Sequence, residues 1–218
     1  MRAGFAPRSS SPSLLMRSTS FFALLIVAVA VGALIVARRH GDSHPSQTSG
    51  TVSMLGDSLN VGVEPYLDDA LGTGWTVVTD DQVGRRSAEG IGELEAGRLA
   101  LGSHVVVSLG TNDTPGTAAT FRNDVQRVLR LVGRSRCVVW ATIWRDGAPS
   151  DSFNDVLRDA ASANHRLRLV EWAEMVRQHP QWLASDGLHG NELGYRERAR
   201  AIADAVRDCV PEQTVKPS

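Results

Sequence analysis

Residues 52–59 read Val-Ser-Met-Leu-Gly-Asp-Ser-Leu, a short apolar run followed by a glycine and by polar residues. The run Val52–Leu55 predicts a strand, and Gly56 predicts a tight turn directly after it. Such runs are rich in valine and other apolar residues, which is typical of strands that are covered on both faces. Four further runs of this kind follow along the chain: Trp75–Val78, Val105–Leu109, Val138–Ile143 and Leu167–Val170.

Amphipathic stretches lie between these runs and predict helices. Five strands that alternate with helices indicate an α/β fold, a three-layer α/β/α sandwich around a central five-stranded parallel sheet. The sheet domain is expected to span residues 51–210, with a disordered tail over 211–218. Two helical apolar faces are clearest, one made of Phe121, Val125, Val128 and Leu129, the other of Ala201, Ile202, Ala205 and Val206.

Length and charge narrow the class of protein. A chain of 218 residues has room for one domain and an appendage. The first 50 residues hold five arginines and one aspartate, so the remainder is mildly acidic, which excludes a basic nucleic-acid-binding domain. Two cysteines are too few for a disulfide scaffold or a cysteine-based zinc site. The sequence has no cluster of metal ligands and no phosphate-binding glycine-rich loop, so we predict no metal and no cofactor.

An uncharged run covers residues 21–37, FFALLIVAVAVGALIVA. As a helix it extends about 26 Å, near the lower limit for crossing a bilayer core. Signal-peptide cores are usually shorter and end at a small-x-small site, whereas this run continues into Arg38 and Arg39. We therefore favour an uncleaved transmembrane anchor over a cleaved signal peptide. A buried core helix is the least favoured alternative, because every face is apolar.

The flanks of the anchor suggest its orientation. Arg2, Arg8, Arg17 and the terminal amino group precede it, and only Arg38 and Arg39 follow it. By the positive-inside rule this balance favours a cytoplasmic N-terminus. We predict a basic cytoplasmic leader over residues 1–20, a single-pass anchor over 21–37 and a flexible linker over 38–50. The C-terminal domain would then lie outside the cytoplasm.

Ligands in open α/β sheets bind beyond the carboxyl ends of the strands, so the residues after each apolar run are informative. Ser58 follows the first run and has two interpretations. It caps the next helix, because serine is a favoured N-cap residue. Alternatively, its hydroxyl is a nucleophile beside backbone N–H groups that stabilise an oxyanion.

Two more strand ends carry candidate oxyanion donors. Asn112, after the third run, is either a turn residue or an amide that donates to a developing negative charge. Gly84, after the second run, offers a backbone N–H that a ligand can approach closely.

A nucleophilic serine also needs a base and an orienting carboxylate. Asp186 and His189, three residues apart before the last helix, fit those roles, with an N-capping aspartate as the alternative.

Together these segments resemble the four sequence blocks of the SGNH hydrolases, the GDSL esterase and lipase superfamily. The blocks occur in order within residues 51–210: GDSL at 56–59, Gly84, G-x-N-D at 110–113 and D-x-x-H at 186–189. The resemblance implies a flavodoxin-like fold with Ser58 as nucleophile, His189 as base and Asp186 as supporting acid. It also implies an oxyanion hole made of the Ser58 and Gly84 N–H groups and the Asn112 amide. The G-x-S-x-G elbow of α/β-hydrolases does not occur in the sequence.

The resemblance further implies a serine esterase that hydrolyses or transfers acyl groups through an acyl-enzyme. The second block and short loops are most similar to those of bacterial members, including catalytic domains attached to cell-wall acyltransferases. Several substrates stay open: a surface carbohydrate, as for an O-acetyltransferase or deacetylase, a lysophospholipid, or a small short-chain ester. A membrane-anchored binding module without catalysis is the rival from another class. We expect a monomer.

Other polar and aromatic residues have structural interpretations. Arg85 and Arg86 are expected to be an exposed basic pair rather than ligands for an anionic substrate. Trp172 and Trp182 are expected to pack in the core rather than to wall a pocket. His104, His165 and His179 are expected to be structural. Cys137 and Cys209 form either a disulfide, if the domain lies outside the membrane, or two buried thiols.

Overall fold

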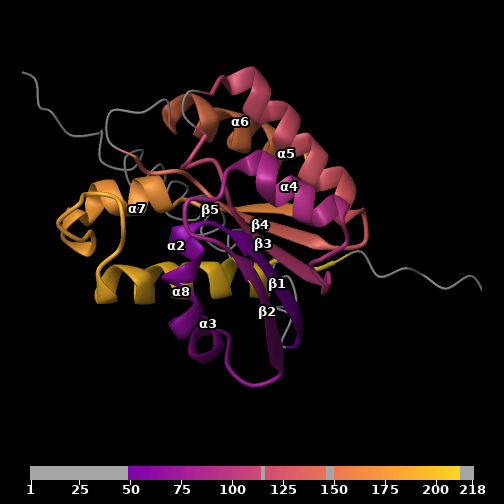
Figure 1. Cartoon of the computed structure of the whole chain (residues 1–218). Coiled ribbons are helices and arrows are strands. Elements are labelled where there is room, and N and C mark those ends of the chain that lie inside the picture. The colour runs from indigo at the N-terminus through magenta and orange to yellow at the C-terminus, as the bar shows by residue number, and fades with distance from the viewer. Residues whose placement is uncertain (1–48, 114–115, 146–149, 212–218) are drawn as a thin grey trace, which may run out of the picture. The chain divides into compact units, whose positions relative to one another are not determined.

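The computed structural model describes residues 49–113, 116–145 and 150–211 (Figure 1). The predicted leader (1–20), anchor (21–37), linker (38–50, except its last two residues) and tail (211–218, except Pro211) lie outside these residues. Within the three described ranges, no helix is both long and apolar enough to cross a bilayer. The leader, anchor, linker and tail therefore stay predictions.

Five parallel strands form one sheet in the order β2-β1-β3-β4-β5 (Figure 1). This confirms the predicted five-stranded parallel sheet. Each strand overlaps one of the apolar runs found in the sequence. The strands are β1 (Gly50–Gly56), β2 (Trp75–Asp81), β3 (His104–Ser108), β4 (Cys137–Ala141) and β5 (Leu167–Val170).

Helices cover both faces of the sheet, which gives the predicted three layers. Helices α4, α5 and α6 lie on one face, and α3 and α8 lie on the other (Figure 1). The bounds are α2 (Ser58–Val61), α3 (Glu64–Leu71), α4 (Ser87–Glu95), α5 (Ala118–Val132), α6 (Ser150–Ala163), α7 (Trp172–Gln178), the 3₁₀ helix η1 (Pro180–Trp182) and α8 (Glu192–Arg207).

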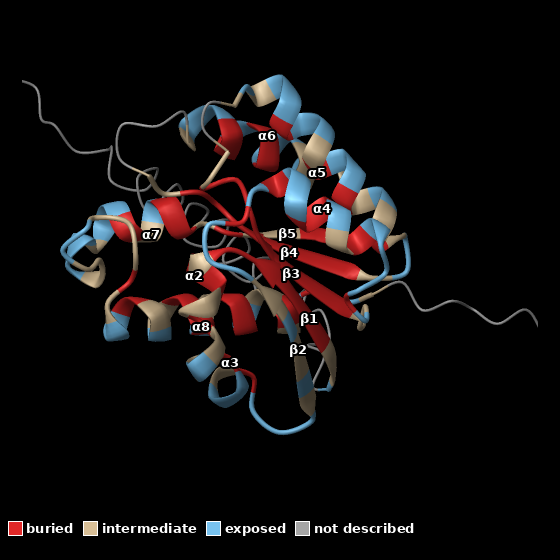
Figure 2. Cartoon of the chain, in the orientation of Figure 1, coloured by how far each residue is buried: buried red, intermediate tan, exposed pale blue. Residues whose placement is uncertain are grey.

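The core has two parts because successive side chains of a strand point to opposite faces of the sheet. In β3, Val105 and Val107 pack toward α4, α5 and α6, whereas Val106 packs toward α3 and α8. The strands β1, β3 and β4 are almost wholly buried (Figure 2). Both faces are covered, so these strands read as continuous apolar runs rather than as alternating patterns.

Three predictions about burial need correction. Strand β2 is half-exposed rather than covered on both faces, because it is the edge strand. In α5, Val132 completes the buried face and Leu129 is only half-buried. In α8, Ala201 and Ala205 are half-buried, because the buried face is rotated toward Gly194, Arg198, Ala199, Ile202, Ala203 and Val206.

The order of the strands determines where a site can form. The chain moves from β1 outward to β2 and then returns past β1 to β3, so the connections after β1 and β3 leave in opposite directions. In such sheets the crevice at this switch point, beyond the carboxyl ends of the strands, is where ligands bind. Ser58 follows β1 and Asn112 follows β3, so both lie at this crevice.

The two cysteines are joined in a disulfide, which confirms the first of the two alternatives. It connects the first residue of β4 to Cys209, two residues after the end of α8, across a sequence separation of 72. Cross-links that close loops of this size stabilise a folded chain by about 2–4 kcal/mol. His104 lies beside it, with Nε2 2.9 Å from the carbonyl oxygen of Cys209, which agrees with its predicted structural role.

Trp172 and Trp182 pack as predicted. Trp172 is fully buried, and the two rings are stacked with their centroids 6.4 Å apart. His179 also stacks on Trp182, at 4.2 Å between ring centroids. Trp172 of α7 and Trp182 of η1 pack in the same core cluster as the buried face of α8.

Candidate active site

Ser58 is the first residue of α2, and the residue before it caps the helix. Asp57 is buried, and its Oδ1 accepts a hydrogen bond from the Leu59 N–H at 3.0 Å. The capping interpretation of Ser58 is therefore wrong, because the neighbouring carboxylate already fills that position. The Ser58 hydroxyl instead faces His189, with Oγ 2.9 Å from Nε2.

Gly56 allows the strand and helix to meet tightly. A Cβ atom at this position would lie 2.5 Å from the side-chain amide nitrogen of Asn60. Any side chain at residue 56 would therefore push α2 away from β1, and Ser58 with it.

The predicted serine, histidine and aspartate converge, although Ser58 and His189 are 131 positions apart. His189 Nδ1 lies 2.7 Å from Asp186 Oδ2. The other oxygen of Asp186, Oδ1, accepts the Leu188 and His189 N–H groups, each at 3.0 Å. Asp186 does not cap α8, since Asn191 does so through the Gly194 N–H at 3.0 Å.

These hydrogen bonds keep Asp186 ionised. The Leu188 N–H, the His189 ring and the His189 N–H lower the pKa of Asp186 to about 2. A carboxylate at that position favours the imidazole tautomer with its proton on Nδ1, which leaves Nε2 free to accept the serine proton.

Two aromatic side chains contact the loop that carries His189. The Trp144 indole N–H donates to the carbonyl oxygen of Gly187 at 3.0 Å. The Tyr195 ring fills the space beside Gly62, where a Cβ atom would lie 2.1 Å from the ring, and it also packs against Gly190. The Tyr195 ring thus packs between the end of α2 and the histidine loop.

The two loops with the proposed oxyanion donors are joined to each other. Asn112 Nδ2 donates to the carbonyl oxygen of Arg85 at 3.1 Å and to Asp57 Oδ2 at 3.2 Å. Gly84 has a φ of +78°, within a turn closed by the Arg85 N–H and the Gln82 carbonyl oxygen at 3.1 Å. Both amide hydrogens of Asn112 thus have protein acceptors, and an oxyanion would have to replace or share one of them.

The prediction that Arg85 and Arg86 form an exposed basic pair is wrong for Arg85. It is only 4% exposed, and its Nη2 lies 2.7 Å from Asp80 Oδ1. Its Nη1 donates to the carbonyl oxygen of Asp80, so the side chain ties the Gly84 turn to the end of β2. Arg86 is exposed, as predicted. The presence of Asp80 five positions earlier was the signal that could have identified the buried partner.

The buried cation Arg198 was not predicted from the sequence. Arg198 is 1% exposed, donates to Ser108 Oγ at 2.8 Å and lies 4.9 Å over the Trp172 ring. Burial raises the pKa of Asp57 to about 6, and the Leu59 N–H and the positive charge of Arg198 oppose that rise. Arg198 is four residues from both Gly194 and Ile202, so helical spacing placed it on the buried face of α8.

Asp81 is a second carboxyl beside α2, and it is half-buried. Asn60 Nδ2 donates to Asp81 Oδ1 at 3.1 Å. Burial, together with the neighbouring carboxyl of Glu64, raises the pKa of Asp81 to about 7. The folded chain therefore holds this proton where the unfolded chain has lost it, and the free energy of unfolding falls as pH rises from about 4 to about 7.

Asp81→Asn is expected to stabilise the protein at about pH 8 and to change its stability little at about pH 4. An asparagine keeps an acceptor for Asn60 and removes the negative charge that burial and Glu64 disfavour. Tm values of the variant and the wild type at the two pH values measure the effect. Asp68→Asn, on the exposed side of α3, is the control and should show no such pH dependence. A lower Tm of Asp81→Asn at pH 8 would contradict the assignment.

In the part of the chain that the structure describes, no group of three or more histidine, cysteine, aspartate or glutamate side chains is arranged to hold a metal ion.

Known proteins resemble this chain in sequence and in fold, although no family model matches it. A Bacillus subtilis (strain 168) protein, YrhL, provisionally assigned as a peptidoglycan O-acetyltransferase, is 23% identical over 171 residues. The match covers 75% of this chain and 25% of that protein, so the chain spans about a quarter of the length of this relative.

Solved structures show the same fold. A lipase/acylhydrolase from Enterococcus faecalis has a TM-score of 0.61 and 21% identity, over 75% of this chain and 99% of that one. A member of the lipolytic protein G-D-S-L family from Veillonella parvula has a TM-score of 0.59 and 18% identity, over 70% and 94% of the two chains. Solved lipases and acylhydrolases, one of them a G-D-S-L family member, thus share the fold of this chain.

Proposed function

We propose that this protein is a serine esterase that works through an acyl-enzyme on Ser58. The hydrogen-bonded series Ser58–His189–Asp186 carries the proposal, with heavy-atom distances of 2.9 and 2.7 Å. These distances lie within the range that proton transfer between a nucleophile and its base requires. A binding module has no need for such an arrangement, so the geometry argues against the catalytically silent alternative.

The proposed reaction has two halves. His189 Nε2 takes the Ser58 proton as Oγ attacks the ester carbonyl carbon, and the carbonyl oxygen becomes a tetrahedral oxyanion. The Ser58 and Gly84 N–H groups and the Asn112 amide are the proposed donors to that oxyanion. The imidazolium then protonates the departing alcohol. Water, or a second alcohol, attacks the acyl-enzyme with His189 again as base, and Ser58 is regenerated.

Hydrolysis and transfer differ in whether water or a second alcohol accepts the acyl group. The relative provisionally assigned as a peptidoglycan O-acetyltransferase supports the carbohydrate O-acetyltransferase or deacetylase as the second candidate. The same triad serves both reactions, since only the acceptor of the acyl group differs.

We also propose that the domain is tethered to a membrane and lies outside the cytoplasm. The uncharged run at residues 21–37 supports the tether. The disulfide between Cys137 and Cys209 supports an oxidising compartment, because such bonds are rare in the cytosol.

Turnover of p-nitrophenyl acetate by the full chain, with Ser58→Ala as control, tests the esterase proposal. Ser58-dependent release of p-nitrophenol supports it. A wild-type chain that neither releases p-nitrophenol nor reacts covalently with a fluorophosphonate would refute it.

Asn112→Ala is expected to lower kcat about 10²–10³-fold, the usual effect of losing one oxyanion donor. The variant also loses two long hydrogen bonds, to Arg85 and Asp57, so its Tm should fall slightly. Rates are therefore measured well below the Tm of the variant. Asn123→Ala, at an exposed position of α5, is the matched control. An unchanged kcat would remove Asn112 from the oxyanion hole.

A further inference from the structure

Asp57 is a buried carboxyl beside the proposed nucleophile, and the reaction proposed above does not use it. Its Oδ1 accepts the Leu59 N–H at 3.0 Å, and its Oδ2 accepts a hydrogen bond from Asn112 Nδ2 at 3.2 Å. The side chain of Thr111, the residue before Asn112, also forms a hydrogen bond with Asp57. The carboxyl group therefore joins the start of α2 to the loop that follows β3.

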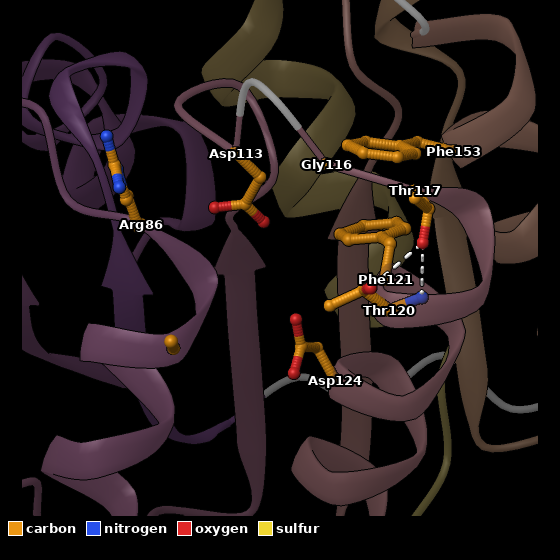
Figure 3. Close-up of a pocket in the computed structure, with 9 residues that line it drawn as sticks. Arg86, Asp113, Gly116, Thr117, Thr120, Phe121, Asp124 and Phe153 are labelled. Atoms are coloured by element: carbon orange, nitrogen blue, oxygen red, sulfur yellow. Dashed lines mark hydrogen bonds between the residues drawn. The ribbon is translucent and has the colours of Figure 1, made fainter.

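The backbone of that loop is held by other contacts. The Asp113 N–H donates to the carbonyl oxygen of Gly110 at 3.2 Å, which closes the turn around Asn112. Asp113 Oδ1 accepts the N–H of Ser87, the first residue of α4, at 2.8 Å. Figure 3 shows the Asp113 side chain beyond the carboxyl end of β3. With the backbone held in this way, the main freedom left to Asn112 is rotation of its side-chain amide.

The orientation of that amide matters because its two ends have opposite chemistry. The NH₂ group donates hydrogen bonds and the oxygen accepts them, although the two ends have almost the same shape. Nδ2 of Asn112 faces two acceptors, the Arg85 carbonyl oxygen at 3.1 Å and Asp57 Oδ2 at 3.2 Å. An oxyanion that shares one of these hydrogens therefore meets the donating end of the amide. An ionised carboxylate can only accept, whereas a protonated one can also donate to the amide oxygen.

A buried cation offsets the charge of Asp57. Arg198 of α8 is 1% exposed and interacts electrostatically with Asp57. Its Nη2 donates to Ser108 Oγ at 2.8 Å, whereas Nε and Nη1 are buried with no hydrogen-bond partner among the described residues. A buried arginine with so few hydrogen bonds is costly unless a negative charge compensates it. The ionised form of Asp57 supplies that charge.

We propose that Asp57 orients the Asn112 amide toward the oxyanion, and that Arg198 holds Asp57 in the ionised form that this role requires. The proposal rests on the esterase function above and adds two positioning residues to the same site. Asp57 acts on the oxyanion donor Asn112 as Asp186 acts on the base His189.

Asp57→Asn is expected to lower kcat for p-nitrophenyl acetate by about 10–100-fold, with KM nearly unchanged, since the oxyanion forms only after binding. An asparagine at residue 57 can present its own NH₂ group to Asn112 and so permits the reversed amide. Asn112→Ala should then cost less than about tenfold in the Asp57→Asn background, against about 10²–10³-fold in the wild type. Asp81→Asn, the same change at another carboxyl beside α2, is the matched control, because Asp81 contacts Asn60 instead.

A pH profile distinguishes this role from a merely structural one. Burial raises the pKa of Asp57 to about 6, and the Leu59 N–H and the charge of Arg198 oppose that rise. Arg198→Met should therefore raise the pKa of Asp57 further and move the fall of kcat toward acid to higher pH. Arg198→Lys keeps the charge and should move it less. His189 and Tyr195 also interact electrostatically with Asp57. In the Asp57→Asn background, Arg198→Met should not move the profile, because an asparagine does not titrate.

The side-chain amide of Asn112 gives a measurement that needs no turnover. Its ¹H–¹⁵N signals, assigned by their loss in Asn112→Ala, should follow the pKa of Asp57, with a midpoint near pH 6 in the wild type. The midpoint should lie at higher pH in Arg198→Met, and Asp57→Asn should abolish the titration. Tm values of all variants identify general unfolding. If Asp57→Asn does not fold, the double variant Asp57→Asn/Arg198→Met, which removes both buried charges, takes its place.

The proposal is overturned if the Asn112 amide signals do not titrate in the wild type. It is also overturned if the losses in kcat from Asp57→Asn and Asn112→Ala multiply, or if Arg198→Met still moves the profile in the Asp57→Asn background. Each of these results leaves the esterase proposal standing, because that proposal is scored separately, by Ser58-dependent turnover of p-nitrophenyl acetate.

Discussion

Replacement of Ser58 by alanine is expected to lower kcat for p-nitrophenyl acetate by at least about 10⁴-fold. The variant retains the proposed oxyanion donors and the base, but it lacks the oxygen that forms the acyl-enzyme. His189 Nε2 then has no hydroxyl at 2.9 Å to deprotonate. Any residual rate above that of water would come from binding and from the oxyanion loops alone.

Covalent labelling gives an independent measurement of the same residue. A fluorophosphonate probe should attach to Ser58 in the wild type, as peptide mass spectrometry can locate, and should not attach to Ser58→Ala. Ser162→Ala, on the exposed side of α6, is the control and should keep both labelling and turnover. Equal turnover by Ser58→Ala and wild type would place the activity elsewhere in the protein or in a contaminant.

The second large effect is expected for Asp186→Asn, with a fall in kcat of about 10³-fold or more. The asparagine oxygen can still accept the Leu188 and His189 N–H groups, so the loop should keep its turn. Its NH₂ group, however, would face His189 Nδ1, where the carboxylate Oδ2 now lies at 2.7 Å. That arrangement favours the tautomer with the proton on Nε2, which cannot accept the proton of Ser58.

The pH dependence distinguishes this tautomer effect from loss of structure. Because the pKa of Asp186 is about 2, the carboxylate stays ionised throughout the pH range of an ordinary assay. If the activity of the wild type falls as the pH is lowered, that fall should therefore not be caused by protonation of Asp186. The variant should show a low kcat across the whole range, with a Tm close to that of the wild type. Asp159→Asn, at an exposed position of α6, is the control. Near-normal kcat in Asp186→Asn would show that water or another group orients His189.

The result at Ser58 shows the limit of what local sequence rules can predict. Serine before a helix is compatible with a cap and with a nucleophile, and the sequence could not choose between them. The structure separates the two because Asp57 caps the helix. Whether a residue caps the helix or is free to act as a nucleophile depends on which side chain the backbone directs toward the N–H groups at the start of α2. Close packing between Gly56 and Asn60 restricts the backbone there.

Charged side chains were the least predictable part of the site. Arg85 and Arg198 were expected at the surface or were not singled out, and both are buried. The partner of Arg85 is Asp80, near the end of β2, and Arg198 contacts Ser108 of β3 and Trp172 of α7. Burial of a charge depends on groups brought together by folding, so composition and periodicity carry little information about it.

The amino-acid order by itself determined the strand–helix alternation and therefore the parallel sheet, because apolar periodicity is a local property of the chain. It also placed four chemically distinctive blocks at the ends of strands and before the last helix. Only the tertiary structure decided that Ser58, His189 and Asp186 are within hydrogen-bonding distance. It likewise closed the disulfide between Cys137 and Cys209, and it joined the loops of Gly84 and Asn112 through a hydrogen bond from Asn112 to Arg85. Such contacts depend on the packing of elements far apart in sequence, which no local pattern encodes.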